Sequence, residues 1–180
     1  MIDIRRIRKL LTQVQQPPDD TPAEGLSESE CDAFEQRTGI RLPNDLRQWL
    51  GLVNGPCIGP GGLYGIHTRR SHLDMEGFLA RFPQWRASKW IPVAGDGCGN
   101  HYVVATRHEY GSGDPVLFVD TSTTPDAPSF IVSSDIGHFI VALLEQELGS
   151  KGWPFDKVYV TKADPAICEF YDVPLPWTAD

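Results

Sequence analysis

The chain has 180 residues, of which 41% are hydrophobic and 22% are charged, and its formal net charge is −8. This composition is typical of one soluble globular domain with a proper core. The negative charge disfavours general nucleic-acid binding, and no apolar run approaches the roughly 20 residues that span a bilayer. The four cysteines lie far apart without a C-x-x-C pair, which excludes a zinc-ligand pattern or a dense disulfide framework. The N-terminus lacks the pattern of a secretory signal, so we expect a cytoplasmic protein with free thiols.

The N-terminal region predicts a short amphipathic helix and a linker. Apolar residues recur at helical spacing over residues 3–16, and basic residues lie outside this stripe. Such a helix could contact a membrane or a partner helix, but packing onto the domain explains the apolar stripe more simply. Residues 15–22 contain three prolines and predict an extended connection. We assign residues 1–23 to this helix and linker.

Two further helices have clear boundary signals. Ser27 followed by Glu30 is a capping box, so a helix is expected from Ser27 to a stop at Gly39. Pro43 begins the next helix at its first turn, where a missing N–H has no cost. Asn54-Gly55 then supplies a left-handed stop. The core-facing stripe of this second helix consists of Leu46, Trp49, Leu50 and Val53.

The middle of the chain predicts strands between helices. Short apolar, β-branched and aromatic runs separated by turn residues are typical of strands. A continuous helical stripe flanked by an N-cap and a glycine is typical of a packed helix. In chain order, we expect a strand over 63–67, a helix over 71–82, a strand–turn–strand over 91–104, strands over 115–120 and 130–132, and a helix over 135–148.

This order of elements indicates an α+β fold. We expect a mainly antiparallel central sheet of about four to six strands, with helices packed against it. The connections between the central strands are too short for helical crossovers, which excludes a doubly wound dinucleotide fold. The fold is assigned to residues 24–150. Residues 151–180 are expected to be a C-terminal extension packed on the domain, with one strand around Val158–Thr161.

The turn within residues 91–104 has the densest group of reactive side chains. It leads into a strand rather than a helix, and Asp96 would repel an anion, so it does not fit a phosphate-binding loop. Cys98 and His101 have no motif of a catalytic nucleophile, and with Asp96 they have no metal-ligand spacing. We therefore expect no catalytic residue, metal or cofactor here. A structural turn is predicted instead, made by Gly95, Asp96, Gly97, Gly99 and Asn100.

An acidic run between residues 19 and 36 contains no Lys or Arg. A solvated helix face explains such a run most simply. Alternatively, charge of one sign can steer and orient a basic protein partner. On this second interpretation the candidate partner-binding residues are Asp19, Asp20, Glu24, Glu28, Glu30, Asp32 and Glu35.

Four segments together resemble the SUKH superfamily, which contains bacterial immunity proteins and homologues of the yeast cell-wall-synthesis regulator. These are Leu42-Pro43-Asn44-Asp45-Leu46, Val53-Asn54-Gly55, Gly62-Leu63-Tyr64-Gly65-Ile66 and the run from Trp90 to Asn100. Each motif is common alone, but their order and spacing are not. The resemblance covers roughly residues 24–148, and the first 20 and last 30 residues match no family motif.

The resemblance implies an α+β domain with a non-enzymatic role. We expect an immunity-type protein that binds and neutralises a cognate bacterial toxin, frequently a nuclease in this superfamily, with a basic surface. Neither nucleic acid nor a membrane is an expected partner. The alternative is an intracellular scaffold or regulatory protein-binding domain. A third hypothesis, a hydrolase or metalloenzyme, would use Asp96, Cys98 and His101.

Overall fold

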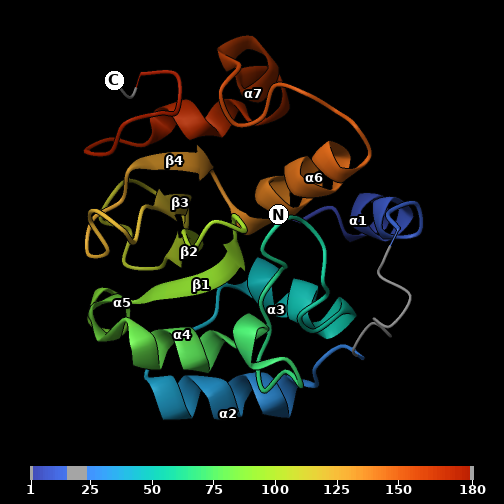
Figure 1. Cartoon of the computed structure of the whole chain (residues 1–180), viewed down its shortest axis with the longest axis vertical. Coiled ribbons are helices and arrows are strands. Elements are labelled where there is room, and N and C mark those ends of the chain that lie inside the picture. Colours follow the sequence, from blue (N-terminus) through green and yellow to red (C-terminus); the bar gives the residue numbers. More distant parts are fainter. Residues whose placement is uncertain (1, 16–23, 179–180) are drawn as a thin grey trace.

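The computed structural model describes residues 2–15 and 24–178, which form one four-stranded sheet surrounded by helices (Figure 1). The strands are β1 (Trp90–Gly95), β2 (His101–Ala105), β3 (Val116–Val119) and β4 (Phe130–Ser133). Every neighbouring pair is antiparallel, and the order in the sheet is β1-β2-β3-β4. The predicted α+β fold with an antiparallel sheet of about four to six strands is confirmed.

Helices pack on both sides of this sheet and at its ends. α4 and α5 pack against β1, α6 packs against β4, and α1 and α3 pack against α6 (Figure 1). None of the helices in the described part of the chain is long and apolar enough to cross a membrane. The helices are α1 (Ile4–Leu11), α2 (Glu28–Thr38), α3 (Asn44–Leu52), α4 (Met75–Arg81), α5 (Pro83–Ser88), α6 (Ile136–Glu147) and α7 (Lys157–Ala163), with 3-10 helices η1 (Ser71–Leu73) and η2 (Pro165–Glu169).

Segments outside the named strands cover both edges of the sheet. At β1, the Tyr64 backbone N–H donates to the Val93 carbonyl at 2.8 Å. The strand predicted over 63–67 is therefore reduced to isolated bridges, one of which joins Leu63 to Ala94. At β4, the Ile131 N–H donates to the carbonyl oxygen of Pro174 at 3.0 Å, and the Trp153 indole N–H donates to the Val132 carbonyl at 3.0 Å.

Two helix predictions in the middle of the chain need correction. The helix predicted over 71–82 is divided, because Asp74 ends η1 and caps α4 by accepting from the Gly77 N–H at 3.0 Å. α5 was not predicted. It begins with Pro83 at its first position, and Lys89 ends it in a left-handed conformation with φ of 57°. The N-terminal helix is also shorter than the predicted residues 3–16, since α1 ends at Leu11.

The strand predicted around Val158–Thr161 is wrong, because these residues belong to α7. Alternating Val and Tyr favours a strand locally. In the structure, however, the Asp156 side chain accepts from the Tyr159 N–H at 3.0 Å and caps the helix, while Val160 is buried beneath it. A cap and one buried contact outweigh a propensity difference of about 1 kcal/mol or less.

The capping-box prediction for α2 is confirmed, but the end of α3 differs from the prediction. α3 ends at Leu52, Val53 is extended, and Pro43 lies just before the helix as its N-cap. Asn54 is buried and does not act as a left-handed stop. Its side-chain amide donates to the Ile66 carbonyl at 2.8 Å, and its oxygen accepts from the Ile66 N–H at 2.8 Å. Asn54 thus attaches the chain after α3 to the segment that covers β1.

His101 is a core side chain, only 5% exposed. Its Nδ1 atom lies 2.7 Å from the Tyr64 hydroxyl. The ring centroids of Phe78, Phe82 and Trp85 lie 4.6, 5.5 and 5.4 Å from that of His101. Burial in this aromatic cluster lowers the pKa of His101 to about 4, because an imidazolium would lose its hydration there.

We predict that Asn54→Ala lowers the free energy of unfolding by about 2–3 kcal/mol, because it leaves the N–H and C=O of Ile66 buried without their partner. Urea unfolding of the two proteins measures this difference. Gln48→Ala on the exposed side of α3 is the matched control and should change stability by less than about 0.5 kcal/mol. Equal effects of the two substitutions would contradict the bridging role of Asn54.

We also predict an acid-dependent loss of stability from His101. Its folded pKa lies below the unfolded value of about 6.5, so the unfolded chain binds more protons between these two values. The contribution is complete above pH 6.5 and is lost as the pH falls toward 4. Between pH 7 and pH 4.5 the loss amounts to about 2 kcal/mol. Comparing the unfolding free energies of wild type and His101→Leu at both pH values measures this contribution.

The pKa of His138 is shifted in the opposite direction to that of His101, so a His138 variant serves as a control. Its pKa is raised, first by the hydrogen bond to Asp135, so its stabilising contribution is present at low pH and is lost as the pH rises through the folded pKa. His138→Gln should therefore make the acid-dependent loss larger, whereas His101→Leu should make it smaller. If the two variants shift the pH dependence in the same direction, the assignment to His101 is wrong.

Candidate functional site

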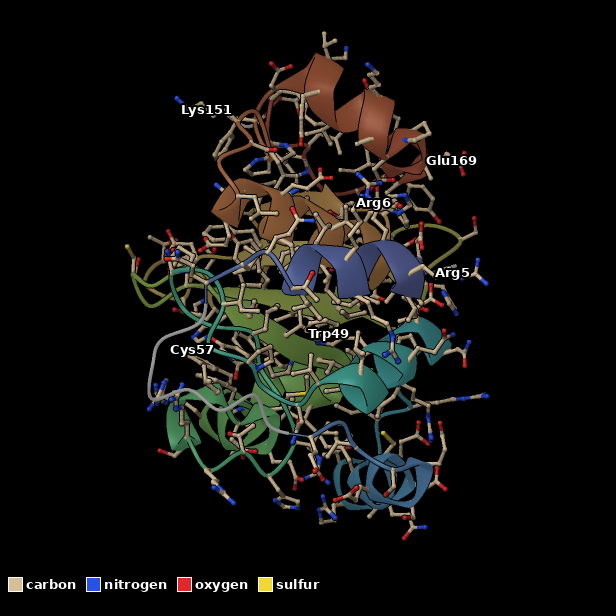
Figure 2. The ribbon with its side chains drawn as sticks, turned by 90° about the vertical axis from the view of Figure 1, so that its right-hand side faces the viewer. Arg5, Arg6, Trp49, Cys57, Lys151 and Glu169 are labelled. Atoms are coloured by element: carbon tan, nitrogen blue, oxygen red, sulfur yellow. The ribbon has the colours of Figure 1, made fainter. Side chains whose placement is uncertain are left out.

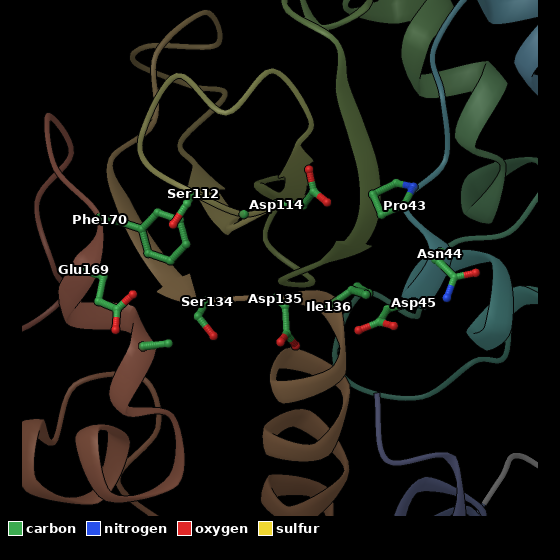
Figure 3. Close-up of a pocket in the computed structure, with 12 residues that line it drawn as sticks. Pro43, Asn44, Asp45, Ser112, Asp114, Ser134, Asp135, Ile136, Glu169 and Phe170 are labelled. Carbon is green, nitrogen blue, oxygen red and sulfur yellow. The ribbon is translucent and has the colours of Figure 1, made fainter. Parts of the chain in front are cut away.

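Two adjoining clefts form the candidate site, which we call the groove. Both are lined by Pro43, Asn44 and Asp114. The first has a volume of about 360 Å³ and lies between the start of α3, the loop before β3, the start of α6 and η2 (Figure 3). The second has a volume of about 430 Å³ and continues toward α2, where Glu35 lines it.

Carboxylates from four separate elements surround the first cleft. Asp45 lies in the first turn of α3, Asp114 precedes β3, Asp135 is the N-cap of α6, and Glu169 is the last residue of η2 (Figure 3). The Phe170 ring adds an apolar wall beside them. The cleft is therefore suited to a cationic group that also has an apolar or flat part.

The C-terminal extension is held in place to form this wall. The Tyr171 N–H donates to the Tyr110 carbonyl at 3.0 Å. Gly111 has a φ of 143°, and a Cβ atom there would lie 3.0 Å from the Phe170 ring. The loop before β3 can approach Phe170 this closely because it has glycine at this position.

Burial and neighbouring groups set the charge of these carboxylates differently. Burial raises the pKa of Asp114, and His108 Nδ1, 3.8 Å from its Oδ1 atom, partly opposes this. Burial also disfavours the ionised form of Asp135, but its hydrogen bonds to the His138 side chain and backbone N–H hold its pKa below the usual value. A cationic partner near Asp114 would favour its ionised form.

Arg47 on α3 dominates the second cleft. Its guanidinium lies 2.7 Å from Glu28, 2.6 Å from Asp32 and 3.1 Å from Glu35. Hydrogen bonding, first to Asp32, raises the pKa of Arg47 despite its partial burial. These contacts attach one side of α2 to α3. Glu28 and Asp32 nevertheless remain largely exposed to solvent, with 81% and 58% of their side chains accessible.

The structure gathers only part of the predicted acidic surface into one region. Asp19 and Asp20 lie outside the described residues, and Glu24 is exposed just before α2. Glu30 accepts hydrogen bonds from the Ser27 N–H and hydroxyl at 2.8 and 2.7 Å, as expected of a capping box. The remaining three residues of the acidic run, Glu28, Asp32 and Glu35, are those bound by Arg47.

Sequence reasoning did not identify the first cleft. Its carboxylates are far apart along the chain, and each has an ordinary local setting, such as the helix cap at Asp135. The only local signal is that helix N-termini place acidic residues at predictable positions. Which of these positions meet in space depends on the path of the C-terminal extension.

The predicted turn lies between β1 and β2, and its polar groups bond within the turn. Asp96 Oδ1 accepts from the N–H groups of Cys98 and Asn100 at 2.7 and 3.0 Å, and Oδ2 accepts from the Asn100 side-chain amide at 2.8 Å. Gly97 and Gly99 have φ angles of 80° and 102°. Cys98 is exposed, whereas the His101 ring lies in the core. These side chains are not assembled into one site.

The hypothesis of a metalloenzyme would place a metal ion at Asp96, Cys98 and His101, in and beside the turn between β1 and β2. Among residues 2–15 and 24–178, no group of three or more His, Cys, Asp and Glu side chains is arranged to hold a metal ion.

Comparison with known proteins places the fold in a family. Residues 25–141 match the sequence model of the SMI1 / KNR4 family (SUKH-1). No curated protein matches the chain. The matched segment is more than half of the chain and includes α2, α3 and all four strands, whereas α1, α7 and η2 lie outside it. The predicted resemblance is confirmed, and the chain belongs to the SMI1 / KNR4 family (SUKH-1).

Proposed function

We propose that this chain is an immunity-type protein that binds and neutralises a cognate bacterial toxin without catalysing a reaction. Family membership supports a protein-binding role of the immunity or SMI1/KNR4 type. The carboxylates of the first cleft are the observation that favours a basic partner within this role, since the second cleft is lined by Arg41 and Arg47 as well as by Glu35. The partner we infer is a toxin with a basic surface, such as a nuclease that must hold phosphate groups.

The groove would recognise Lys or Arg side chains of the toxin. A cation that enters the first cleft meets Asp45, Asp114 and Glu169, while Phe170 offers a ring face for a guanidinium. Exposed carboxylates on α2 extend the negative surface beyond the second cleft. Charges at such a rim act mainly on the rate of association and on orientation, and the partly buried carboxylates of the first cleft contribute affinity.

The arrangement of the reactive turn supports a non-enzymatic role. A Cys–His pair needs the imidazole within hydrogen-bond reach of the thiol. Here the nitrogen of His101 faces Tyr64 in the core, and Cys98 is exposed in the turn. Asp96 already accepts three hydrogen bonds within the turn. We propose a cytoplasmic location because Cys31, Cys98 and Cys168 are free thiols, as is usual in a reducing compartment.

An intracellular scaffold or regulatory domain is the second candidate, favoured by the match to the SMI1 / KNR4 family. Both candidates use protein binding, so the gene context distinguishes them. A toxin gene beside this one supports the immunity role, whereas a gene that stands alone supports the scaffold role.

We predict that Glu169→Lys weakens toxin binding about tenfold, which corresponds to about 1.4 kcal/mol. Glu169 is exposed at the end of η2, so the substitution should reverse charge in the groove without disturbing the core. Calorimetric titration with the purified product of the adjacent reading frame measures the dissociation constant. Asp126→Lys makes the same charge change in an exposed loop outside the groove and should leave binding within twofold.

Two results would contradict the proposal at different levels. Equal binding by wild type and Glu169→Lys would show that the groove is not the docking surface. If the neighbouring product is harmless when expressed alone, or forms no complex with this chain, the immunity role itself fails.

A further inference from the structure

The exposed large apolar side chains of the described residues are confined to one stretch near the C-terminus. They are Leu148, Phe155, Val158 and Tyr171, with exposed fractions of 40%, 62%, 75% and 55%. Phe155 and Val158 flank the start of α7, which lies at one end of the long axis of the molecule (Figure 1). We call the exposed surface of Lys151, Phe155, Lys157, Val158 and Lys162 the α7 end.

Three lysines lie close to these two apolar residues in the sequence. Lys151, Lys157 and Lys162 are exposed, and none has an ion-pair partner within the described parts of the chain. Gly152 is held against α7, since a Cβ atom there would lie 3.0 Å from the Tyr159 ring, so Lys151 lies beside the first turn of the helix. Figure 2 shows Lys151 and the groove residue Glu169 on opposite sides of the C-terminal extension.

The two carboxylates of the same stretch bond to the protein itself. Asp156 caps α7 by accepting from the Tyr159 N–H at 3.0 Å. Asp164 is 4% exposed and accepts from the backbone N–H and hydroxyl of Ser134 at 2.7 and 2.6 Å. Asp164 is therefore buried, whereas Asp156 stays exposed beside the three exposed lysines, which outnumber it. The α7 end presents positive charge on a protein whose net charge is −8.

The position of this surface favours a flat partner. Phe155 contacts the Phe130 ring edge-on, with centroids 5.9 Å apart, and otherwise projects into solvent. A cleft adjoins α7 and is lined by Trp153, Tyr159 and Val160, but neither Phe155 nor Val158 lines it. Projecting apolar side chains among lysines are typical of segments that enter the interface of an anionic bilayer.

We propose that the α7 end docks on an anionic membrane surface. Phe155 and Val158 enter the headgroup region, and the three lysines meet lipid phosphates and carboxylates. This inference goes beyond toxin binding and does not rest on it. It also differs from the expectation that a membrane is no partner, which was based on the lack of a spanning segment and on packing of the N-terminal helix onto the domain.

The acidity of the whole chain does not prevent this contact. α2 and its carboxylates lie at the opposite end of the molecule from α7 (Figure 1). At physiological ionic strength the Debye length is about 8 Å, so charges at the far end are largely screened from the membrane. Three lysines and two apolar side chains produce weak, reversible binding that depends on salt and on anionic lipid.

Sedimentation with lipid vesicles tests the proposal on the full chain. We expect binding to vesicles of phosphatidylcholine with phosphatidylserine, no binding to phosphatidylcholine alone, and release at high salt. The double substitution Lys157→Glu with Lys162→Glu should reduce the binding constant about tenfold or more. Phe155→Ser with Val158→Ser should also reduce it several-fold. Arg69→Glu, an exposed charge reversal in the loop before η1, is the matched control and should bind as wild type does.

Unfolding curves of each variant establish that the fold is kept, since all four substituted residues are exposed. Three outcomes would overturn the proposal. The first is equal binding to neutral and anionic vesicles, or no binding to either. The second is binding of a polyglutamate peptide without vesicle binding, which would assign the surface to an acidic protein. The third is concentration-dependent dimerisation that is lost in Phe155→Ser with Val158→Ser, without vesicle binding, which would assign it to a second copy.

Discussion

The structure depends on the need to pair the backbone groups at both edges of a small, buried sheet. An unpaired buried N–H or C=O costs free energy comparable to a lost hydrogen bond. With four strands in an open sheet, half of the strands are edges. Residues 62–65 cover β1, and Trp153 and Pro174 cover β4. Two irregular segments therefore have fixed positions, although neither contains a strand.

Asn54 holds in place the segment that covers β1. A single side chain satisfies both backbone groups of Ile66, while its own neighbours Val53 and Gly55 turn the chain away from α3. This explains why a segment with four glycines between residues 59 and 65 follows a defined path. A Cβ atom at Gly61 would lie 2.4 Å from the Gly95 backbone, so the close approach to β1 requires glycine there.

The cover of β4 has the larger functional consequence. Residues that reach β4 from beyond the segment matched to the family also bring η2 against the loop before β3. Glu169 and Phe170 thereby complete a cleft whose other walls, at α3 and α6, belong to the matched segment. The matched segment supplies one side of the first cleft, and the C-terminal extension supplies the other.

Signals within a few residues predicted most helices and strands, whereas contacts between distant parts of the chain form the candidate site. The capping box of α2, the stripe of α3 and the strand–turn–strand at Gly95–Asn100 each lie within a few residues, so the sequence pattern indicated them. α7 was misread because Val158 and Val160 alternate with polar or aromatic residues, while the deciding contacts are a cap at Asp156 and burial beneath the helix. Local preference is weak wherever tertiary packing opposes it.

The acidic run shows the same limit for function. Its seven carboxylates are visible in the sequence, but Arg47, which binds three of them, comes from the next helix. Nothing in the periodicity of either helix indicates that pairing. The carboxylates of the first cleft come from four elements, so no window of sequence contains more than one or two of them.

Negative and positive charges of this protein therefore lie on separate regions of its surface. On α2, negative charge is partly balanced by Arg47 yet stays accessible, which suits steering at long range. In the first cleft, carboxylates from four elements converge and three of them are partly buried, which suits specific contact with a cation. At the α7 end the sign is reversed, because three exposed lysines outnumber the exposed Asp156, while Asp164 is buried and bonds to Ser134. Lys151 at the α7 end and Glu169 in the groove lie on opposite sides of the C-terminal extension, so the two charged surfaces face different directions (Figure 2).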